Sequence, residues 1–302
     1  MKELLDTTAS EIAAEFTRAR KQAGSPAMGM VMTLVVVVAE DDATEALAAA
    51  RAASHEHPAR VLGVILGDKR GTGCVNAHVG IGSGWTGETA TIRLTGEVVK
   101  HAESVVLPLL LPDSPVAVWW PSDPPADPAA DPLGALGQRR ITDAASVTRG
   151  RTTALATQCS AYVKGNTDLA WTRLTPWSAL LAAALDQHQL TITGGSVTAE
   201  RTSPSADLLV AWLRSRLKIE ISRHTSAGPG ITEVVLESKA GAVRISREDG
   251  SLGTFSTPNR PDRPIALKRR GVPELLMEEL RRLDEDDVYA ATVRWLGKQG
   301  AQ

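Results

Sequence analysis

The 302-residue sequence contains only two cysteines, Cys74 and Cys159, and neither lies in a Cys-x-x-Cys pair or a histidine-rich tract. A disulfide scaffold is therefore excluded. The sequence also lacks an excess of either charge, because 33 lysines and arginines stand against 35 aspartates and glutamates. A formal net charge of -2 argues against nucleic acid as a partner. Lys268-Arg-Arg270 is a basic patch, but it is too short to change that conclusion.

Long apolar runs are also missing. The most apolar stretches, Val31–Ala39 and Val105–Pro112, are far shorter than the roughly 20 residues of a membrane-spanning helix. Residues 1–9 lack the basic start, apolar stretch and cleavage site of a signal peptide. With 43% hydrophobic and 23% charged residues, the composition predicts a soluble, globular protein of the cytoplasm without a membrane role.

Motifs of nucleotide and hydrolase chemistry are missing or lack their context. Gly82-Ser-Gly-Trp-Thr-Gly87 matches GxGxxG, but strand-like Thr89–Leu94 follows it, where the dinucleotide fingerprint needs a helix. A glycine-rich hairpin is the better interpretation. His55-Glu-His57 lacks a third metal ligand and is typical of a helix end, and Cys159 lies in the apolar phase of a predicted helix. The sequence thus predicts no catalytic, cofactor-binding or metal-binding residue, and no cofactor.

Alternating helix and strand signals indicate an α/β (α+β) protein. Met30–Val38 and Arg60–Leu66 are apolar strands joined by an Ala-rich helix, so they should pair in parallel. Cys74–Ile81 and Thr89–Leu94 are shorter and more polar, as in an antiparallel hairpin. Residues 1–167 are therefore expected to form an N-terminal domain with a mixed, partly parallel sheet flanked by helices.

The remainder of the chain, residues 168–302, is expected to form a smaller α+β domain. Thr175–Gln187 and Ser205–Leu217 are helical patterns, and short strand-like alternations recur between residues 219 and 267. That order predicts a mainly antiparallel sheet. Two further helices, 272–283 and 286–296, close the chain.

Tryptophan is over-represented among the few aromatic residues, with seven tryptophans against two tyrosines and two phenylalanines. Trp119 and Trp120 are neighbours on a predicted strand, so their side chains should point to opposite faces of the sheet. Trp171 and Trp177 flank a short segment that contains Arg173. Core packing and a partner interface are both open for these five residues, which are candidate interface or interface-supporting positions.

One further hypothesis concerns an anionic ligand. His57 and Arg60 lead into an apolar strand and are candidates for a weak anion site. This is the feature that would belong to a stand-alone protein binding a sugar phosphate or a nucleotide. A hydrolase or transferase with an unfamiliar site is a third class that the sequence leaves open.

Four blocks of sequence resemble the glucose-6-phosphate dehydrogenase assembly protein family, OpcA. The blocks are His57-Pro-Ala-Arg-Val61, Glu103–Pro112 running into Val116-Ala-Val-Trp-Trp-Pro121, Asp168-Leu-Ala-Trp-Thr-Arg-Leu-Thr-Pro-Trp177 with Ala182–Gln187, and Ala206-Asp-Leu-Leu-Val-Ala-Trp-Leu213. They are spread over most of the chain in matching order, and the block from Asp168 to Trp177 is specific.

This resemblance implies a non-catalytic partner of glucose-6-phosphate dehydrogenase that promotes the active oligomer and acts as an allosteric effector in the pentose phosphate pathway. Photosynthetic members are tied to thioredoxin through cysteines, but Cys74 and Cys159 lie in unrelated contexts. The family supplies no catalytic residues. The alternative of a stand-alone sugar-phosphate- or nucleotide-binding protein stays open at this point, and the sequence does not address self-association.

Overall fold

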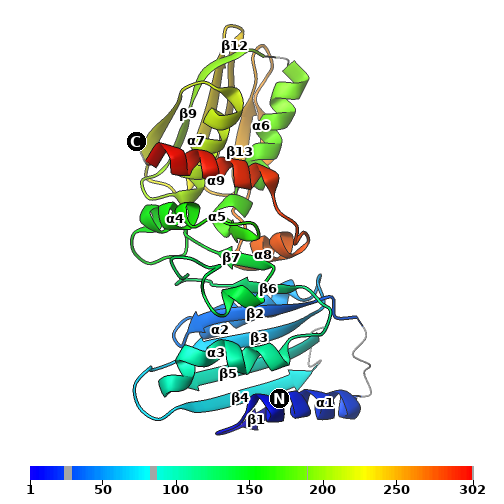
Figure 1. Ribbon diagram of the computed structural model, residues 1–302. Coiled ribbons are helices and arrows are strands. Elements are labelled where there is room, and N and C mark those ends of the chain that lie inside the picture. Colours follow the sequence, from blue (N-terminus) through cyan, green and yellow to red (C-terminus); the bar gives the residue numbers. More distant parts are fainter. Residues whose placement is uncertain (24–28, 82–86, 189, 301–302) are drawn as a thin grey trace. The chain divides into compact units, whose positions relative to one another are not determined.

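The computed structural model describes residues 1–23, 29–81, 87–188 and 190–300 (Figure 1). The chain forms two compact units: unit 1 contains residues 1–143, 163–167 and 272–285, and unit 2 contains 144–162, 168–271 and 286–302. The boundary expected between residues 167 and 168 is one of the points where the chain passes from one unit to the other. The sequence analysis did not anticipate the crossings at residues 143, 162, 271 and 285.

Unit 1 contains a mixed sheet of eight strands in the order β1-β4-β5-β3-β2-β6-β7-β8. The strands are β1 (Lys2–Leu4), β2 (Met32–Ala39), β3 (Ala59–Leu66), β4 (Cys74–Ile81), β5 (Gly87–Thr95), β6 (Val116–Trp119), β7 (Arg139–Thr142) and β8 (Asn166–Asp168). β5, β3, β2, β6 and β7 pair in parallel, whereas β1 with β4 and β4 with β5 pair antiparallel. The expected parallel pair and the antiparallel pairing of residues 74–81 with 89–94 are confirmed. The glycine-rich segment between the latter two lies mostly outside the described residues.

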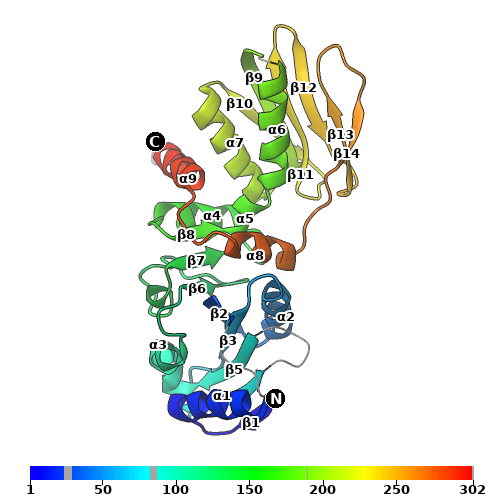
Figure 2. The same ribbon diagram turned by 90° about the vertical axis from the view of Figure 1, so that its right-hand side faces the viewer.

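Helices cover both faces of this sheet because its central strands are apolar on both sides (Figure 2). They are α1 (Ala9–Ala23), α2 (Ala43–Ala53), η1 (Gly96–His101), α3 (Ala102–Val106), η2 (Leu107–Leu109), η3 (Gly134–Leu136) and α8 (Val272–Leu280). Phe16 of α1 and Val106 of α3 share a core with Val35 and Leu62. A Cβ on Gly63 would lie 2.4 Å from Cδ2 of Leu47 on α2, so a side chain at position 63 would displace that leucine.

Unit 2 contains a six-stranded sheet in the order β10-β9-β11-β12-β13-β14. Its elements are α4 (Arg151–Ser160), α5 (Leu169–Thr172), α6 (Thr175–His188), β9 (Ile192–Glu200), α7 (Pro204–Leu217), β10 (Ile221–Ser226), β11 (Ile231–Ser238), β12 (Gly241–Ser246), β13 (Leu252–Ser256), β14 (Arg263–Ala266) and α9 (Asp287–Gly300). Only β9 and β10 pair in parallel among the neighbouring strands. The mainly antiparallel second sheet is therefore confirmed.

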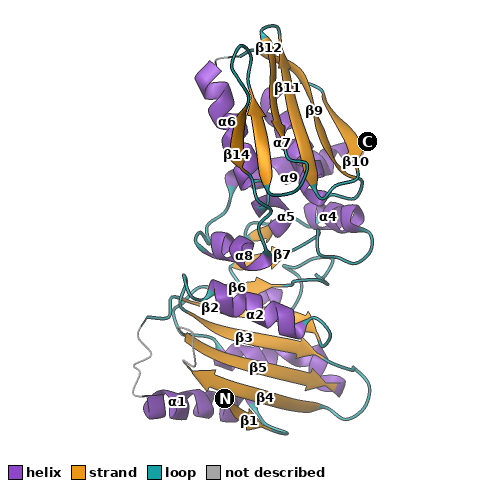
Figure 3. Ribbon diagram, turned by 180° about the vertical axis from the view of Figure 1, so that it is seen from behind, coloured by secondary structure: helices purple, strands orange, loops and turns teal. Residues whose placement is uncertain are grey.

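One face of this second sheet carries the core of unit 2. Alternate residues such as Val234, Leu236, Val243 and Ile245 are buried and share a cluster with Leu209 of α7. Arg244, between two buried residues of β12, is exposed. Seen from behind, this opposite face of the sheet carries no helix among the described elements (Figure 3).

Two local features depart from a simple alternation of helix and strand. Residues 96–109 form three short helices, η1, α3 and η2, and Pro108 in η2 supplies no backbone N–H to continue an α-helix. β13 was not expected, since Gly253 interrupts its short pattern. In the described part of the chain, no helix combines the length and apolarity needed to cross a bilayer.

Candidate functional site

The adjacent tryptophans of the first sheet are both core residues. Trp119 is 0% exposed and Trp120 is 3% exposed. Trp120 belongs to the cluster that contains Phe16 and Val35, and strand alternation places Trp119 on the other face of the sheet. Neither ring reaches the surface, so a role in a partner interface would be to support it from within. That role stays a prediction.

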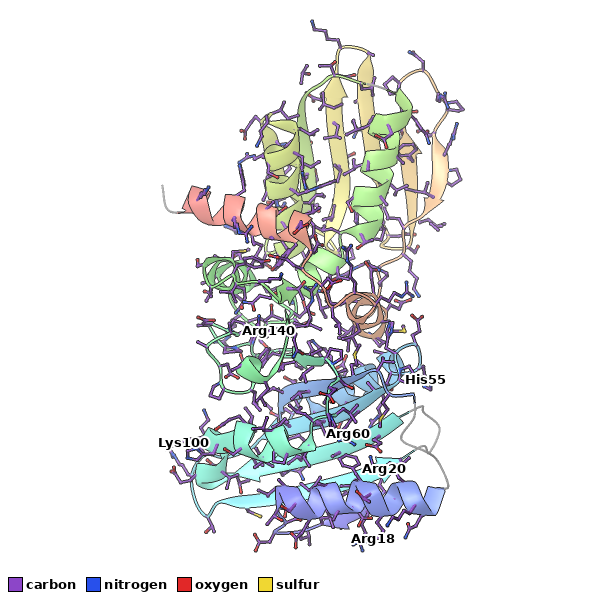
Figure 4. The ribbon with its side chains drawn as sticks, turned by 45° about the vertical axis from the view of Figure 1, so that its right-hand side comes forward. Arg18, Arg20, His55, Arg60, Lys100 and Arg140 are labelled. Atoms are coloured by element: carbon purple, nitrogen blue, oxygen red, sulfur yellow. The ribbon has the colours of Figure 1, made fainter. Side chains whose placement is uncertain are left out.

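His57 and Arg60 both have partners inside unit 1, and Figure 4 labels Arg60 together with Arg20. The Arg60 Nε lies 2.8 Å from Glu88 Oε2, and its Nη1 donates to the Leu109 carbonyl at 2.7 Å. Arg20 reaches the same carboxylate from α1, at 3.0 Å. The His57 Nε2 lies 3.1 Å from the carbonyl oxygen of Met277. Glu88 thus already supplies the anion for Arg60, and the predicted site at His57 and Arg60 stays an untested prediction.

Burial determines the electrostatics of Arg60. The residue is 6% exposed and its guanidinium lies 4.7 Å from the centre of the Phe16 ring. Burial lowers the pKa of Arg60 below its ordinary value, although the Glu88 carboxylate opposes that shift. Such a cation depends on its carboxylate partner, as buried charges in proteins generally do. These contacts describe a structural ion pair.

The segment from Asp168 to Trp177 is held in place by contacts of Asp168 and Trp171. Asp168 is fully buried and caps α5, accepting from Ala170 N at 2.8 Å and Ala144 N at 3.0 Å. Trp171 is half-buried, and its Nε1 donates to Asp286 Oδ2 at 2.8 Å. Its ring packs on Tyr289 with centroids 5.6 Å apart. Among the predicted interface tryptophans of the described chain, Trp171 is the half-buried one.

A cationic cavity of about 420 Å³ lies in unit 2, beside this segment. Arg173, Pro176 and Trp177 form one side of it. The other walls come from the ends of strands and the starts of helices that are distant in sequence. Those wall residues are Ala145, Ser146, Arg151, Glu200, Ser203, Pro204, Ser205, Gly230, Ile231, Arg247, Lys268, Arg269 and Arg270. Six cationic side chains thus meet one carboxylate in a single cavity, and we call this feature the cationic cavity.

Helix N-termini also face this region. Arg151 begins α4, Thr175-Pro176 begins α6, and Ser203-Pro204 are the cap and first residue of α7. The Ser203 side chain accepts from Ala206 N at 3.3 Å. The first-turn N–H groups of a helix carry a partial positive charge that favours a nearby anion. The backbone therefore adds to the positive potential of the side chains.

Arg247 is the buried cation of the cavity. It is 6% exposed, its Nη1 donates to Leu267 O at 2.9 Å and its Nη2 donates to Ile231 O at 3.0 Å. Its Nε has no hydrogen-bond partner within the described residues. The guanidinium lies 5.1 Å from the centre of the Trp177 ring, so this tryptophan packs against Arg247 in the cavity wall.

The surroundings of Arg247 disfavour its charged form. Burial, together with the charge of Arg269, lowers the pKa of Arg247 to about 10, and Asp249 partly opposes this shift. The Asp249 carboxylate itself accepts the backbone N–H groups of Ser251 and Leu252. The Nη1 of Arg151 lies 3.5 Å from Oε1 of Glu200. Within the described residues, Arg247, Lys268 and Arg269 form no ion pair with a carboxylate.

The other candidate reactive groups are the two cysteines and any cluster of metal ligands, and neither forms a reactive site in the described residues. Cys159 is buried, and burial with the nearby Asp168 charge raises the pKa of its thiol to about 12, as expected of a core cysteine. Cys74 is half-buried and its Sγ lies 3.5 Å from Asn76 Oδ1. Within the described residues, no three His, Cys, Asp or Glu side chains are arranged to hold a metal ion.

Of the cavity residues, Arg173 and Trp177 were predicted as site residues from the sequence, and the others were not. Lys268-Arg-Arg270 was visible as a basic patch, and Pro176 and Pro204 mark helix starts. What the linear sequence does not show is that these signals meet Arg247 and Arg151 at one point. That convergence follows from the pairing of β9 with β11 and of β11 with β12.

Comparison with known families gives two matches that together cover most of the chain. Residues 50–159 match the glucose-6-phosphate dehydrogenase subunit N-terminal domain, and residues 164–293 match the C-terminal domain of the same subunit. A protein of Synechocystis sp. (strain PCC 6803), named for the OxPP cycle and OpcA, is 27% identical over 194 residues. That match covers 62% of this chain and 37% of the length of the relative.

Two solved structures show a weaker likeness. An oxidoreductase from Sinorhizobium meliloti has a TM-score of 0.48 at 9% identity, covering 89% of this chain and 96% of that one. A D-galactose-1-dehydrogenase protein from Rhizobium etli has a TM-score of 0.39 at 14% identity, covering 90% and 95%. Likenesses at this level carry no conclusion about activity.

Proposed function

Because this chain belongs to the OpcA family of glucose-6-phosphate dehydrogenase assembly proteins, we propose that it binds that dehydrogenase, favours its assembled form and catalyses no reaction itself. The observation that carries the proposal is the pair of family domains, which match residues 50–159 and 164–293 in order. The proposed partner is glucose-6-phosphate dehydrogenase, and the proposed setting is the oxidative branch of the pentose phosphate pathway in the cytoplasm.

The first strand–helix turn of the parallel sheet argues against a dinucleotide-dependent activity. In dinucleotide-binding folds this turn is rich in glycine and the helix N-terminus receives the pyrophosphate. Here the turn from β2 to α2 reads Glu40-Asp41-Asp42. Asp42 is the N-cap of α2 and accepts from Ser122 Oγ at 2.6 Å, and Glu40 pairs with Arg93 at 2.7 Å. Carboxylates at this helix start would repel a pyrophosphate.

The proposed mechanism is a difference in affinity between two states of the enzyme. A partner shifts an equilibrium only if it binds one state more tightly, and such couplings are typically about 1–3 kcal/mol. The chain would bind the assembled, substrate-competent dehydrogenase more tightly than the resting form. Binding would then lower the apparent KM or raise the assembled fraction.

Trp171 is the proposed contact residue of this interaction. It lies in the segment that most specifically resembles the family, and it is half-buried while Trp119, Trp120 and Trp177 are buried. A large ring at the edge of a surface can exclude water from a contact. We therefore assign Trp171 and Arg173 to the contact surface, and Trp119, Trp120 and Trp177 to supporting roles within their own units.

Steady-state kinetics test the proposal. Glucose-6-phosphate dehydrogenase is assayed with and without an excess of the chain, and the chain is assayed alone. The expected results are a changed KM or kcat for the mixture and no turnover by the chain. Identical kinetics together with an unchanged oligomer size, or substantial turnover by the isolated chain, would overturn the proposal.

A pair of tryptophan variants sharpens this test. Trp171→Ala should weaken binding of the dehydrogenase about tenfold or more, as interface aromatics often do. Trp295→Ala is the matched control, because Trp295 is also half-buried in unit 2 but lies outside the matched C-terminal domain. Equal losses in the two variants would contradict the assignment of Trp171. The folding of each variant is checked by thermal unfolding.

A further inference from the structure

The cationic cavity gathers positive charge that its own lining carboxylate does not balance. Arg151, Arg173, Arg247, Lys268, Arg269 and Arg270 line it, with Glu200 as the one carboxylate among the lining residues. Lys268 and Arg269 are exposed, whereas Arg247 is 6% exposed. Like charges held this close repel one another, and an anion in the cavity would remove that repulsion.

A second, independent feature is the buried guanidinium of Arg247. Its two Nη groups are held by the carbonyl oxygens of Leu267 and Ile231, and its Nε has no partner within the described residues. A buried cation without a carboxylate partner is costly to fold around. Arg247 lies in the wall of a cavity that other arginines also line, and this combination points to a ligand that supplies the negative charge.

We propose that the cationic cavity is a binding site for a small phosphomonoester. A phosphomonoester carries about -1.5 to -2 charges near neutral pH and three acceptor oxygens, which matches several cations better than a single carboxylate does. Arginines suit this group because a guanidinium can donate two parallel hydrogen bonds to phosphate oxygens. The N-termini of α4, α6 and α7 offer further positive potential at the same place.

The size of the cavity limits the ligand. A volume of about 420 Å³ is at the lower end of the range of about 300–1,000 Å³ for small-molecule sites. It suits a phosphorylated sugar and not a long nucleic acid, for which the formal net charge of -2 is also unfavourable. The site differs from the predicted one at His57 and Arg60, which lies in unit 1.

The cations that line the cavity differ in exposure, and we therefore expect them to have different roles. Lys268 and Arg269 are exposed and directly available to a ligand. Arg247 lies in the wall and contributes its positive charge from there, because two carbonyl groups and the Trp177 ring hold its guanidinium in place. Replacing the exposed pair should therefore remove affinity without disturbing the fold.

Isothermal titration of the full chain with inorganic phosphate, at constant ionic strength set with chloride, is the direct test. Glucose 6-phosphate and glucose are titrated in parallel, since they differ only by the phosphate group. We expect saturable binding of one equivalent of phosphate and of glucose 6-phosphate, and no binding of glucose. No saturable binding of either phosphate compound, or binding only of a phosphoserine peptide, would overturn the proposal.

Two double variants locate the site. Lys268→Gln with Arg269→Gln should weaken phosphate binding on the order of tenfold or more. Lys239→Gln with Arg260→Gln removes the same charge from exposed positions of unit 2 outside the cavity and should leave the affinity unchanged. Equal losses in both would show that phosphate responds to overall charge only, which contradicts the site. Arg247→Met, checked for folding by thermal unfolding, should abolish binding.

These titrations contain no dehydrogenase, so their outcome is independent of the proposed partner. Binding of phosphate without any effect on the enzyme would refute only the assembly role. An effect on the enzyme without phosphate binding would refute only the site.

Discussion

Glu88→Gln is the substitution that tests most directly how unit 1 holds its buried arginine. The Glu88 carboxylate is 3% exposed and accepts from both Arg60 and Arg20. Glutamine keeps the shape, but it removes the charge and turns an –NH₂ donor toward a guanidinium that has only donors. Arg60, whose pKa burial already lowers, would be left as an uncompensated buried cation.

The expected loss can be estimated from this geometry. Removing one partner of a buried ion pair typically costs about 3–5 kcal/mol of unfolding free energy. Glu97→Gln is the control in the same unit, since Glu97 pairs with Lys100 at 3.0 Å with side chains 72% and 59% exposed. An exposed pair of this kind contributes about 0–1 kcal/mol.

Urea unfolding and hydrogen exchange measured by mass spectrometry provide the assay. Exchange in peptides from β3 and β5, which carry Arg60 and Glu88, reports the stability of unit 1 separately from that of unit 2. Glu88→Gln should lower protection there strongly, and Glu97→Gln should not. A double variant, Arg60→Met with Glu88→Leu, should recover much of the loss, because replacing both charges leaves neither one buried alone. If Glu88→Gln and Glu97→Gln were equally stable, the structural role assigned to Arg60 would be wrong.

Two further predictions concern single positions. The pKa of Cys159 is raised from 9.0 to about 12. The contribution of its thiol to the free energy of unfolding is therefore complete below pH 9 and is lost as the pH rises from 9 to 12, by at most about 4 kcal/mol. Cys159→Ala should abolish this part of the alkaline dependence in urea unfolding, and stability curves of the two proteins that stay parallel up to pH 12 would contradict the prediction. Gly165 has φ +92°, and a Cβ there would lie 2.2 Å from the Gln138 carbonyl oxygen. Gly165→Ala should therefore destabilise unit 1 by about 1–3 kcal/mol or more. Gly297→Ala is the control, because Gly297 lies in α9 with open space around its Cα, and it should be neutral or slightly stabilising. Thermal unfolding of the two variants measures this difference, and equal stability would contradict the prediction.

Much of the fold could be predicted because apolar patterning is a local signal. The eight residues of β2 are apolar except for Thr33, and seven of them are buried, so the sequence alone indicates a central strand. β7 could not be found this way, since Arg139 and Arg140 look like surface residues. In the structure both are buried: Arg139 pairs with Glu279, and Arg140 donates to Asn166 Oδ1 at 2.6 Å.

The candidate site was less predictable because it depends on long-range contacts. Arg173 and Trp177 were identified from the resemblance and the tryptophan pattern, and the structure places both in the cationic cavity. Arg247 follows an ordinary alternating strand, and nothing near it in sequence marks it as buried. Only the pairing of the strands brings its guanidinium onto Trp177, 70 residues earlier in the chain.

The proposed binding of glucose-6-phosphate dehydrogenase is tested most directly by the mass of the species that forms when the two proteins are mixed. The two purified proteins are mixed at micromolar concentration and separated on a sizing column with light scattering, alone and together. We expect one co-eluting species heavier than either component, with more of the dehydrogenase in its assembled form. Two peaks at the separate masses, at every ratio of the proteins, would contradict it.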